Sequence, residues 1–379
     1  MNTFRKKYNC LFIIDIVPNH TSFDSPWLLE CPDAAYNTKN TPALTSAYLF
    51  DEAIQHLSVQ IMKGERKEFP EPFIRNEDDV NKVMHILANE MIPERKIHEY
   101  FLFSIGKVME ELRKYVRKTY PDVRIPDQHI DYEEDMNITS VDDAIAMIFP
   151  QLEKHQKNLG AAPFGATLDM KPICEFLVKN APKISYEAVQ IALKKLNPKN
   201  EEMARGYINE GLGAVRENLM QERIFSGNHK ITETNQLLPP YFTVLKDGTK
   251  CANNGWMYVQ DINESFADCP HFHYLRRHVV IWGDLVKLRY GNSKEDCPYL
   301  WRRMKKHVQM MAKAFDGFRI DNSHSTPMHV CEYLIRKARK VNPAFYVFAE
   351  LFTESVETDA LYQKRVGFNS LVREVMRVS

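Results

Sequence analysis

The stretch FDGFRIDNSHSTP at residues 315–327, followed by YVFAE at residues 346–350, decides the fold of this chain. Residues 315–321 and 346–350 are predicted strands, and residues 327–341 between them carry the apolar stripe of a helix. Thr326 is the predicted N-cap of that helix. A strand, a helix and a second strand in this order predict a βαβ unit with parallel strands and a right-handed connection.

Each of these predicted strands ends in a carboxylate, Asp321 in the first and Glu350 in the second. Barrels of the α/β type carry their chemistry at this end of their strands. Arg319 lies two residues before Asp321, hence on the same face, where its guanidinium would orient the carboxylate. Two carboxyls about 5–5.5 Å apart are what retaining glycosidases and transglycosidases use. From the residues alone, an Asp and a Glu that only cap the following helices are the alternative.

Several motifs resemble the glucanotransferase half of eukaryotic glycogen debranching enzymes, a family of the α-amylase superfamily. They are GFRIDNSHSTP with the later AELFT, WGDLVKLRYGNSKEDCPYLW, and PDAAYN. DIVPNHTS near the N-terminus is similar to the first short motif of the superfamily, at the end of barrel strand three. The likeness is close at residues 8–60 and 240–379 and looser between them.

The resemblance implies an α/β fold, a partial (β/α)8 TIM barrel that contains strands three to five and a large, mainly helical insertion after strand three. Residues 1–40 and 276–379 are the expected barrel segments, and residues 41–275 the insertion. Residues 9–17 read as a strand buried on both faces. Further helices are predicted from residue 76 onward and at residues 105–116, 140–149, 185–196 and 201–224.

The implied function is that of a 4-α-glucanotransferase in glycogen breakdown, with Asp321 forming a covalent glucosyl intermediate and Glu350 acting as acid and base. The barrel's other strands and the third acid of the family have no counterpart in the motifs, so the chain is expected to be a fragment, a truncated gene model or a short isoform. Residues 1–379 alone are therefore expected to be catalytically silent. An α-glucan hydrolase and a silent glycogen-binding or regulatory fragment are the alternatives.

The resemblance also implies a set of substrate-binding residues. The DIVPNH stretch would shape the subsite of the sugar that is cleaved, and His324 would face the acceptor sugar. Two tryptophans on segments that read as turn-rich could stack on sugar rings, with core packing as the alternative. The predicted substrate-binding residues are Asp15, Asn19, His20, Arg319, His324, Trp256 and Trp282.

Composition limits the remaining function classes. Lys plus Arg and Asp plus Glu number 50 each, so no net field draws the chain to nucleic acid or to a membrane surface. Seven cysteines, an odd number without repeated spacing, favour free thiols and a cytoplasmic protein. The apolar runs are shorter than the roughly 20 residues of a membrane span. The resemblance implies glycogen or another α-1,4-glucan as the partner, and the oligomeric state stays open.

No cofactor is expected, because the sequence contains no nucleotide-binding glycine motif. Cys269, His271 and His273 in CPHFH could suggest a metal site. A zinc site needs about four ligands, and no second pair completes this set. The sequence therefore predicts no metal.

Overall fold

The computed structural model of the chain describes residues 2–134, 137–257, 271–351 and 356–372. The chain forms two compact units, which we describe separately. The first contains Met1–Asn40, Pro239–His273 and His278–Ser379, and the second contains Thr41–Leu238 and Tyr274–Arg277. Within the described ranges, each helix is too short or too polar to cross a membrane.

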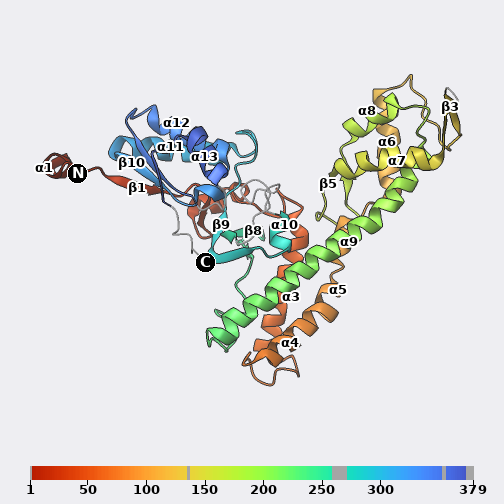
Figure 1. Cartoon of the computed structure of the whole chain (residues 1–379). Coiled ribbons are helices and arrows are strands. Elements are labelled where there is room, and N and C mark those ends of the chain that lie inside the picture. Colours follow the sequence, from red (N-terminus) through yellow and green to blue (C-terminus); the bar gives the residue numbers. More distant parts are fainter. Residues whose placement is uncertain (1, 135–136, 258–270, 352–355, 373–379) are drawn as a thin grey trace. The chain divides into compact units, whose positions relative to one another are not determined.

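A parallel sheet forms the centre of the first unit (Figure 1). Its strand order is β1 (Ile13–Ile16), β10 (Gly317–Ile320), β11 (Tyr346–Glu350) and β12 (Ser370–Val372). Phe318 and Ile320 point into a core that they share with α11 (Pro298–Ala314) and α12 (Met328–Arg339). Val347 and Ala349 enter the same core, while the alternate residues of β11 stay half-buried. The period of two thus gives β10 and β11 one helix-covered face each, as predicted.

The structure shows the predicted fold class in part. The sheet has a fourth parallel strand, β12, where three were expected. Among the described residues, hydrogen bonds join these four strands in an open row, so they do not show a closed barrel. The fold that the structure shows is therefore mixed α/β.

The first predicted strand is shorter and more exposed than expected. A helix, α1 (Asn2–Tyr8), precedes it, and only Ile13–Ile16 pair as β1. Leu11 is 64% exposed and Ile13 is 39% exposed, so the prediction of burial on both faces is wrong. The reason is that β1 lies at one edge of the sheet, where its residues have a strand neighbour on one side only.

A second sheet in the same unit is antiparallel and was not predicted. Its order is β2 (His20–Ser22), β9 (Val279–Lys287), β8 (Lys250–Met257) and β7 (Phe242–Val244). Trp256 lies in β8 and Trp282 in β9, so the expectation of turn-rich segments is wrong for both. The pairing of β8 with β9 slips between Asn253 and Gly255. A Cβ at position 255 would lie 2.1 Å from the carbonyl oxygen of Val280, so this close approach requires glycine.

Short elements complete the first unit. α12 begins at Met328, with Pro327 and not Thr326 as its N-cap, because residues 323–325 form the separate turn η5 and Thr326 follows that turn. The others are α2 (Pro26–Glu30), η1 (Pro32–Ala34), η5 (Ser323–Ser325) and α13 (Val356–Val366), and α10 (His271–Leu275) ends in the second unit.

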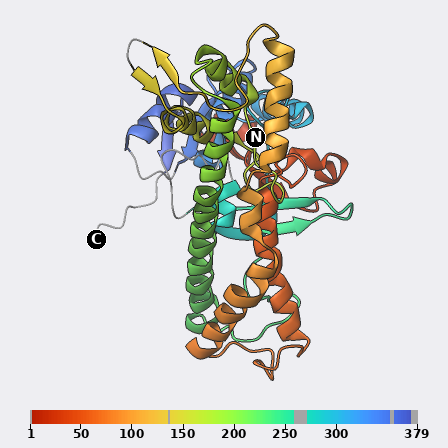
Figure 2. The same cartoon turned by 90° about the vertical axis from the view of Figure 1, so that its right-hand side faces the viewer.

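The second unit is mainly helical, and its long helix α9 (Tyr186–Leu219) lies beside α3 (Leu44–Met62) (Figure 2). Residues 185–196 and 201–224 were predicted as two helices, but α9 passes through Pro198 without a break until Leu219. The missing N–H of Pro198 removes one helical hydrogen bond. The buried face continues on both sides of it through Leu196 and Ala204, and this packing holds the two parts in one helix.

Two of the remaining helices of the second unit, α4 and α7, begin with a side-chain N-cap. Asn76 caps α4 by accepting a hydrogen bond from the N–H of Asp79, and Ser140 forms a capping box with Asp143 at α7. Residues 41–238 of the predicted insertion lie here, whereas residues 239–257 belong to the first unit. The elements are α4 (Glu77–Ile86), η2 (Leu87–Met91), α5 (Ile92–Glu94), η3 (Ile97–Phe101), α6 (Ile105–Thr119), β3 (Tyr132–Glu134), β4 (Asn137–Thr139), α7 (Val141–Lys154), β5 (Gln156–Lys157), β6 (Thr167–Leu168), α8 (Met170–Lys179) and η4 (Met220–Phe225).

Candidate active site

The two strand-end carboxylates meet around one arginine of the first unit. Asp321 directly follows β10, and Glu350 is the last residue of β11, which pairs with β10 in parallel. Arg319 places Nη1 3.1 Å from Oδ1 of Asp321 and Nη2 3.0 Å from Oε1 of Glu350. Parallel strands end at the same edge of a sheet, and this brings the two acids together.

Asp15 supplies a third carboxylate to the same guanidinium. Its Oδ2 lies 3.3 Å from Nη1 of Arg319, because β1 pairs with β10 so that Asp15 stands opposite Arg319. Partial burial acts to lower the pKa of Arg319, but the charges of Glu350, Asp15 and Asp321 prevail and raise it above its ordinary value. Arg319 is therefore a permanent cation that holds the acids of three neighbouring strands.

Asn322 makes a second connection between the two strand-end acids. Its backbone N–H donates to Oε2 of Glu350 at 3.0 Å, and its side-chain Nδ2 donates to Oδ2 of Asp321 at 3.2 Å. The residue has φ 44° and ψ 53°, in the left-handed region. Asn is one of the few residues other than glycine that enter this region readily.

A cavity of about 580 Å³ opens directly at these carboxylates. Trp256 and Trp282 are 42% and 38% exposed at this cavity, so neither ring is part of a core. The structure thus brings the two predicted tryptophans to the two predicted acids. The lining residues are His20, Trp256, Trp282, Asp284, Leu285, Asp321, Asn322 and Glu350.

Both predicted histidines, His20 and His324, have a pKa below the ordinary value. Burial, assisted by the charge of Lys287, lowers the pKa of His20 to about 4 against the opposing charge of Asp284. The ring of His20 lies 6.3 Å from the indole of Trp282, and its Nδ1 is 3.3 Å from Nδ2 of Asn254. His20 thus supports the wall of the cavity beside Trp282.

His324 is the more deeply buried of the two histidines. Burial lowers its pKa to about 4, opposed by Glu350 and assisted by Lys287. Its ring does not appear among the side chains that line the cavity of Trp256 and Trp282. His324 therefore lies close enough to Glu350 to sense its charge, but it does not line this cavity.

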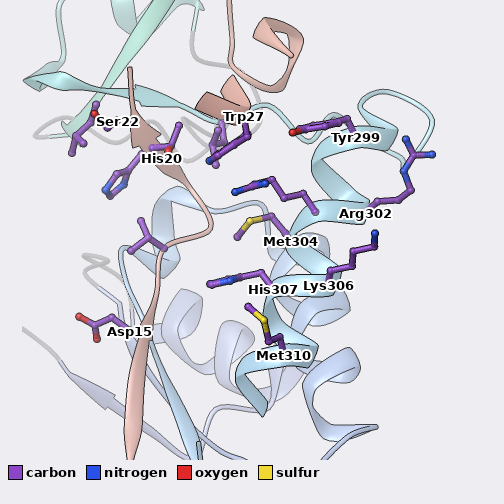
Figure 3. A pocket seen from close by; sticks show the side chains of 15 residues that line it. Asp15, His20, Ser22, Trp27, Tyr299, Arg302, Met304, Lys306, His307 and Met310 are labelled. Carbon is purple, nitrogen blue, oxygen red and sulfur yellow. The ribbon is translucent and has the colours of Figure 1, made fainter. Parts of the chain in front are cut away.

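Asp15 and Asn19 lie outside this cavity. Asn19 is 1% exposed, and within the described residues neither polar atom of its side chain has a hydrogen-bond partner. Asp15 lines a second cavity, of about 830 Å³, that also receives side chains of α11 (Figure 3). Its carboxylate points away from His307 and Met310 of α11 in that view, toward the side of Arg319.

The larger cavity does not contain the strand-end acids. Of the predicted site residues it is lined only by Asp15 and His20, and its other charged groups come from α11, where Arg302, Arg303 and Lys306 are exposed. Figure 3 shows Arg302 and Lys306 along one flank of the cavity. The smaller cavity, with both carboxylates in its wall, is therefore the candidate active site.

The structure describes only part of the CPHFH stretch. Cys269 lies outside the described residues, and His273 is buried. In the ranges that the structure describes, no three His, Cys, Asp or Glu side chains gather as metal ligands would.

Sequence reasoning missed three residues of the site, namely Asp284, Leu285 and Asn322. Asp284 and Leu285 follow Trp282 in WGDL, and strand alternation puts Trp282 and Asp284 on one face of β9. That signal was available once β9 was recognised as a strand. For Asn322 the only sequence signal was its position directly after a strand-end Asp. Asparagine is enriched in the left-handed backbone conformation that such a turn needs.

Comparisons with known proteins point to one family. A family model described as "Glycogen debranching enzyme, glucanotransferase domain" matches residues 1–346. The chain is 35% identical over 384 residues to the glycogen debranching enzyme of Saccharomyces cerevisiae, an alignment that covers 97% of this chain. It covers 24% of the yeast protein, so the chain spans about a quarter of the length of that relative.

Two solved structures are similar to part of the chain. An α-amylase from Anoxybacillus is 17% identical, with a TM-score of 0.21, over 24% of this chain and 19% of its own. An α-amylase from Geobacillus thermoleovorans, complexed with acarbose, is 18% identical, with a TM-score of 0.23, over 32% of this chain and 24% of its own.

Proposed function

Because this chain belongs to the family of the glycogen debranching enzyme glucanotransferase domain, we propose that it carries the reacting carboxylates of a 4-α-glucanotransferase that acts on glycogen or another α-1,4-glucan. One observation supports this most. Asp321 and Glu350 share Arg319 and Asn322 at the wall of a cavity that also exposes Trp256 and Trp282.

The proposed first step forms a glucosyl ester on Asp321. A carboxylate oxygen of Asp321 attacks C1 of the donor sugar while the bond from C1 to the leaving O4 breaks. Glu350, in its protonated form, gives its proton to that O4, and the shortened glucan departs with a free 4-hydroxyl. Arg319 and Asn322 hold the two carboxyl groups in place for this step.

The second step regenerates the enzyme. Glu350, now ionised, takes the proton of an acceptor 4-hydroxyl, and the acceptor oxygen attacks C1. The ester bond to Asp321 breaks as the new α-1,4 bond forms, so the total number of glycosidic bonds in the mixture is unchanged. Water in place of the acceptor would give hydrolysis, the reaction of the nearest alternative, an α-glucan hydrolase.

The walls of the cavity suit a neutral sugar chain. Trp256 and Trp282 supply exposed aromatic faces against which the C–H faces of a pyranose can pack. Asp284 lines the same cavity and can bond sugar hydroxyls. His20 has one ring nitrogen near Asn254, and we assign it to the cavity wall near the sugar that is cleaved.

We also propose the finer fold and the compartment that the family implies. The four parallel strands would be part of a (β/α)8 barrel, with residues 1–40 and 276–379 as barrel segments and residues 41–275 as an insertion. Six cysteines of the described residues are free thiols, which supports a cytoplasmic protein. No metal or cofactor has a role in the proposed steps.

The test is an assay of maltopentaose with the longest protein that the gene encodes and, in parallel, with residues 1–379 alone. Transfer would yield both longer and shorter maltooligosaccharides at a constant number of reducing ends. A rising number of reducing ends would instead show the hydrolase. Retention of the longest protein on glycogen without turnover would support the silent binding protein. We expect transfer by the longest protein and silence of residues 1–379 alone.

A further inference from the structure

Two residues, Arg319 and Asn322, contact the four carboxylate oxygens of Asp321 and Glu350. Arg319 contacts Oδ1 of Asp321 and Oε1 of Glu350. Asn322 donates to the other oxygen of each, Oδ2 of Asp321 and Oε2 of Glu350. Each carboxylate therefore has one oxygen in contact with Arg319 and the other hydrogen-bonded to Asn322. These two contacts restrict the rotation of the carboxylate group.

Asn322 reaches both acids only because of its backbone conformation. The chain leaves β10 at Ile320, and with φ 44° at Asn322 it turns so that the N–H faces the end of β11. The side chain of the same residue returns to its neighbour Asp321. Alanine, which has a Cβ but no polar side chain that can hydrogen-bond locally, would be strained at this φ, whereas glycine would not.

We propose that Asn322 is a positioning residue of the glucan-transfer reaction, one that sets the orientation of both carboxylates through two separate donors. This inference rests on the proposed function, because it gives those carboxylates their roles. The side-chain amide serves Asp321, and the left-handed backbone serves Glu350. Arg319 supplies the positive charge beside the two carboxylates, and Asn322 sets their orientation.

Substitutions at position 322 separate the two donors. Asn322→Gly keeps the backbone turn and the N–H to Glu350 but removes the amide on Asp321. Asn322→Ala removes the same amide and also strains the turn. Since a misplacement of about 1 Å can cost about 100-fold in rate, we expect kcat to fall by about 10- to 100-fold in Asn322→Gly, with KM within about twofold of wild type. The alanine variant should be slower still.

The order of kcat in the glycine and alanine variants tests the role of the backbone turn most clearly. At most positions alanine preserves a fold better than glycine, and the order reverses only where φ is positive. Asn322→Asp keeps the size and the turn but puts a carboxylate beside Asp321, so its kcat should be the lowest of the three. Asn9→Gly is the matched control, since Asn9 has φ 46° and is exposed outside the cavity.

Two measurements test this proposal. The first is maltopentaose kinetics of the longest gene product, and the second is NMR of residues 1–379 carrying 15N-labelled asparagine. Glu350→Gln should shift the backbone amide signal of Asn322, and Asp321→Asn should shift its side-chain NH2 signals. A wild type without turnover would contradict the proposed function, and the NMR shifts would still decide the contacts. Wild-type kcat in Asn322→Gly, a faster alanine than glycine variant, or unmoved Asn322 signals would each overturn the positioning role.

Discussion

Arg319 forms an ion pair with Glu350, with Nη2 3.0 Å from Oε1. From the sequence we expected this arginine to serve Asp321 alone, since the two share a face of one strand. The register of the sheet places Arg319 opposite Phe348 of β11, so the guanidinium also reaches the end of that strand. The acid that we assign to proton transfer therefore has a cation beside it.

The first prediction follows from this shared contact. Arg319→Ala should lower kcat by about 100-fold, because three carboxylates lose their common cation and the reacting pair loses its alignment. Arg319→Lys should recover little of the rate, since an ammonium cannot reproduce the planar two-sided contact. The measurement is kcat and KM for maltopentaose in the longest gene product. A variant that keeps kcat and loses only glycogen affinity would show that Arg319 holds substrate instead.

The second prediction concerns Glu350. Glu350→Gln should slow transfer from maltopentaose, whose leaving sugar oxygen must be protonated, far more than transfer from α-maltosyl fluoride, whose fluoride leaves without protonation. Rates with both donors are compared under the same conditions, and an acceptor is supplied in excess. Equal losses with the two donors would indicate a structural role for Glu350.

The third prediction tests the aromatic walls of the cavity. Trp256→Ala and Trp282→Ala should each raise KM for maltopentaose by about tenfold, the equivalent of about 1.4 kcal/mol. Trp27→Ala is the control, because Trp27 stacks on Tyr299 at the larger cavity, with ring centroids 6.4 Å apart. An equal rise of KM in the control, or no rise in either cavity variant, would remove the tryptophans from the binding site.

The structure agrees with the sequence best where a local period was strong. The strand at residues 346–350 ends where it was predicted, because its alternation of buried and half-buried residues is visible in YVFAE. β12 has three residues after Gly367 and no period that could reveal it. β8 and β9 contain Asn, Gly and Lys at buried positions, so their pairing depends on contacts with distant segments.

The site residues, too, were predictable only where a local pattern identified them. Asp321, Glu350 and Arg319 were readable because strand alternation and strand ends are local properties. The cavity joins His20 of β2 to residues more than 230 positions later, and the sequence suggested this only through motif resemblance. The role of Asn322 depends on a single backbone angle and on the end of another strand, which no local pattern records.

The fourth prediction concerns pH and stability. The pKa of His20 and that of His324 are about 4 in the folded chain, below the ordinary value of about 6.5 that they regain on unfolding. Between pH 6.5 and 4 the unfolded chain therefore binds more protons than the folded chain. The contribution of these two neutral rings to the free energy of unfolding is complete above about pH 6.5 and declines as the pH falls toward 4.

Urea unfolding at pH 7 and pH 5 measures this dependence. The wild-type midpoint should be lower at pH 5, and His324→Gln should reduce the difference between the two pH values, because it removes one of the two titrating rings. A control substitution of the exposed surface residue Asn9 should leave the difference unchanged. An unaltered pH dependence in the His324 variant would contradict a neutral, buried ring at that position.

The central claim, that Asp321 is the nucleophile, is tested most directly by trapping its glucosyl ester. The longest gene product carrying Glu350→Gln, whose second step is slowed, is incubated with 5-fluoro-α-glucosyl fluoride without acceptor and digested for peptide mass spectrometry. We predict a fluoroglucosyl adduct on the peptide that contains Asp321, and no adduct after Asp321→Asn. An adduct on another carboxylate, or unimpaired transfer by Asp321→Asn, would contradict the account.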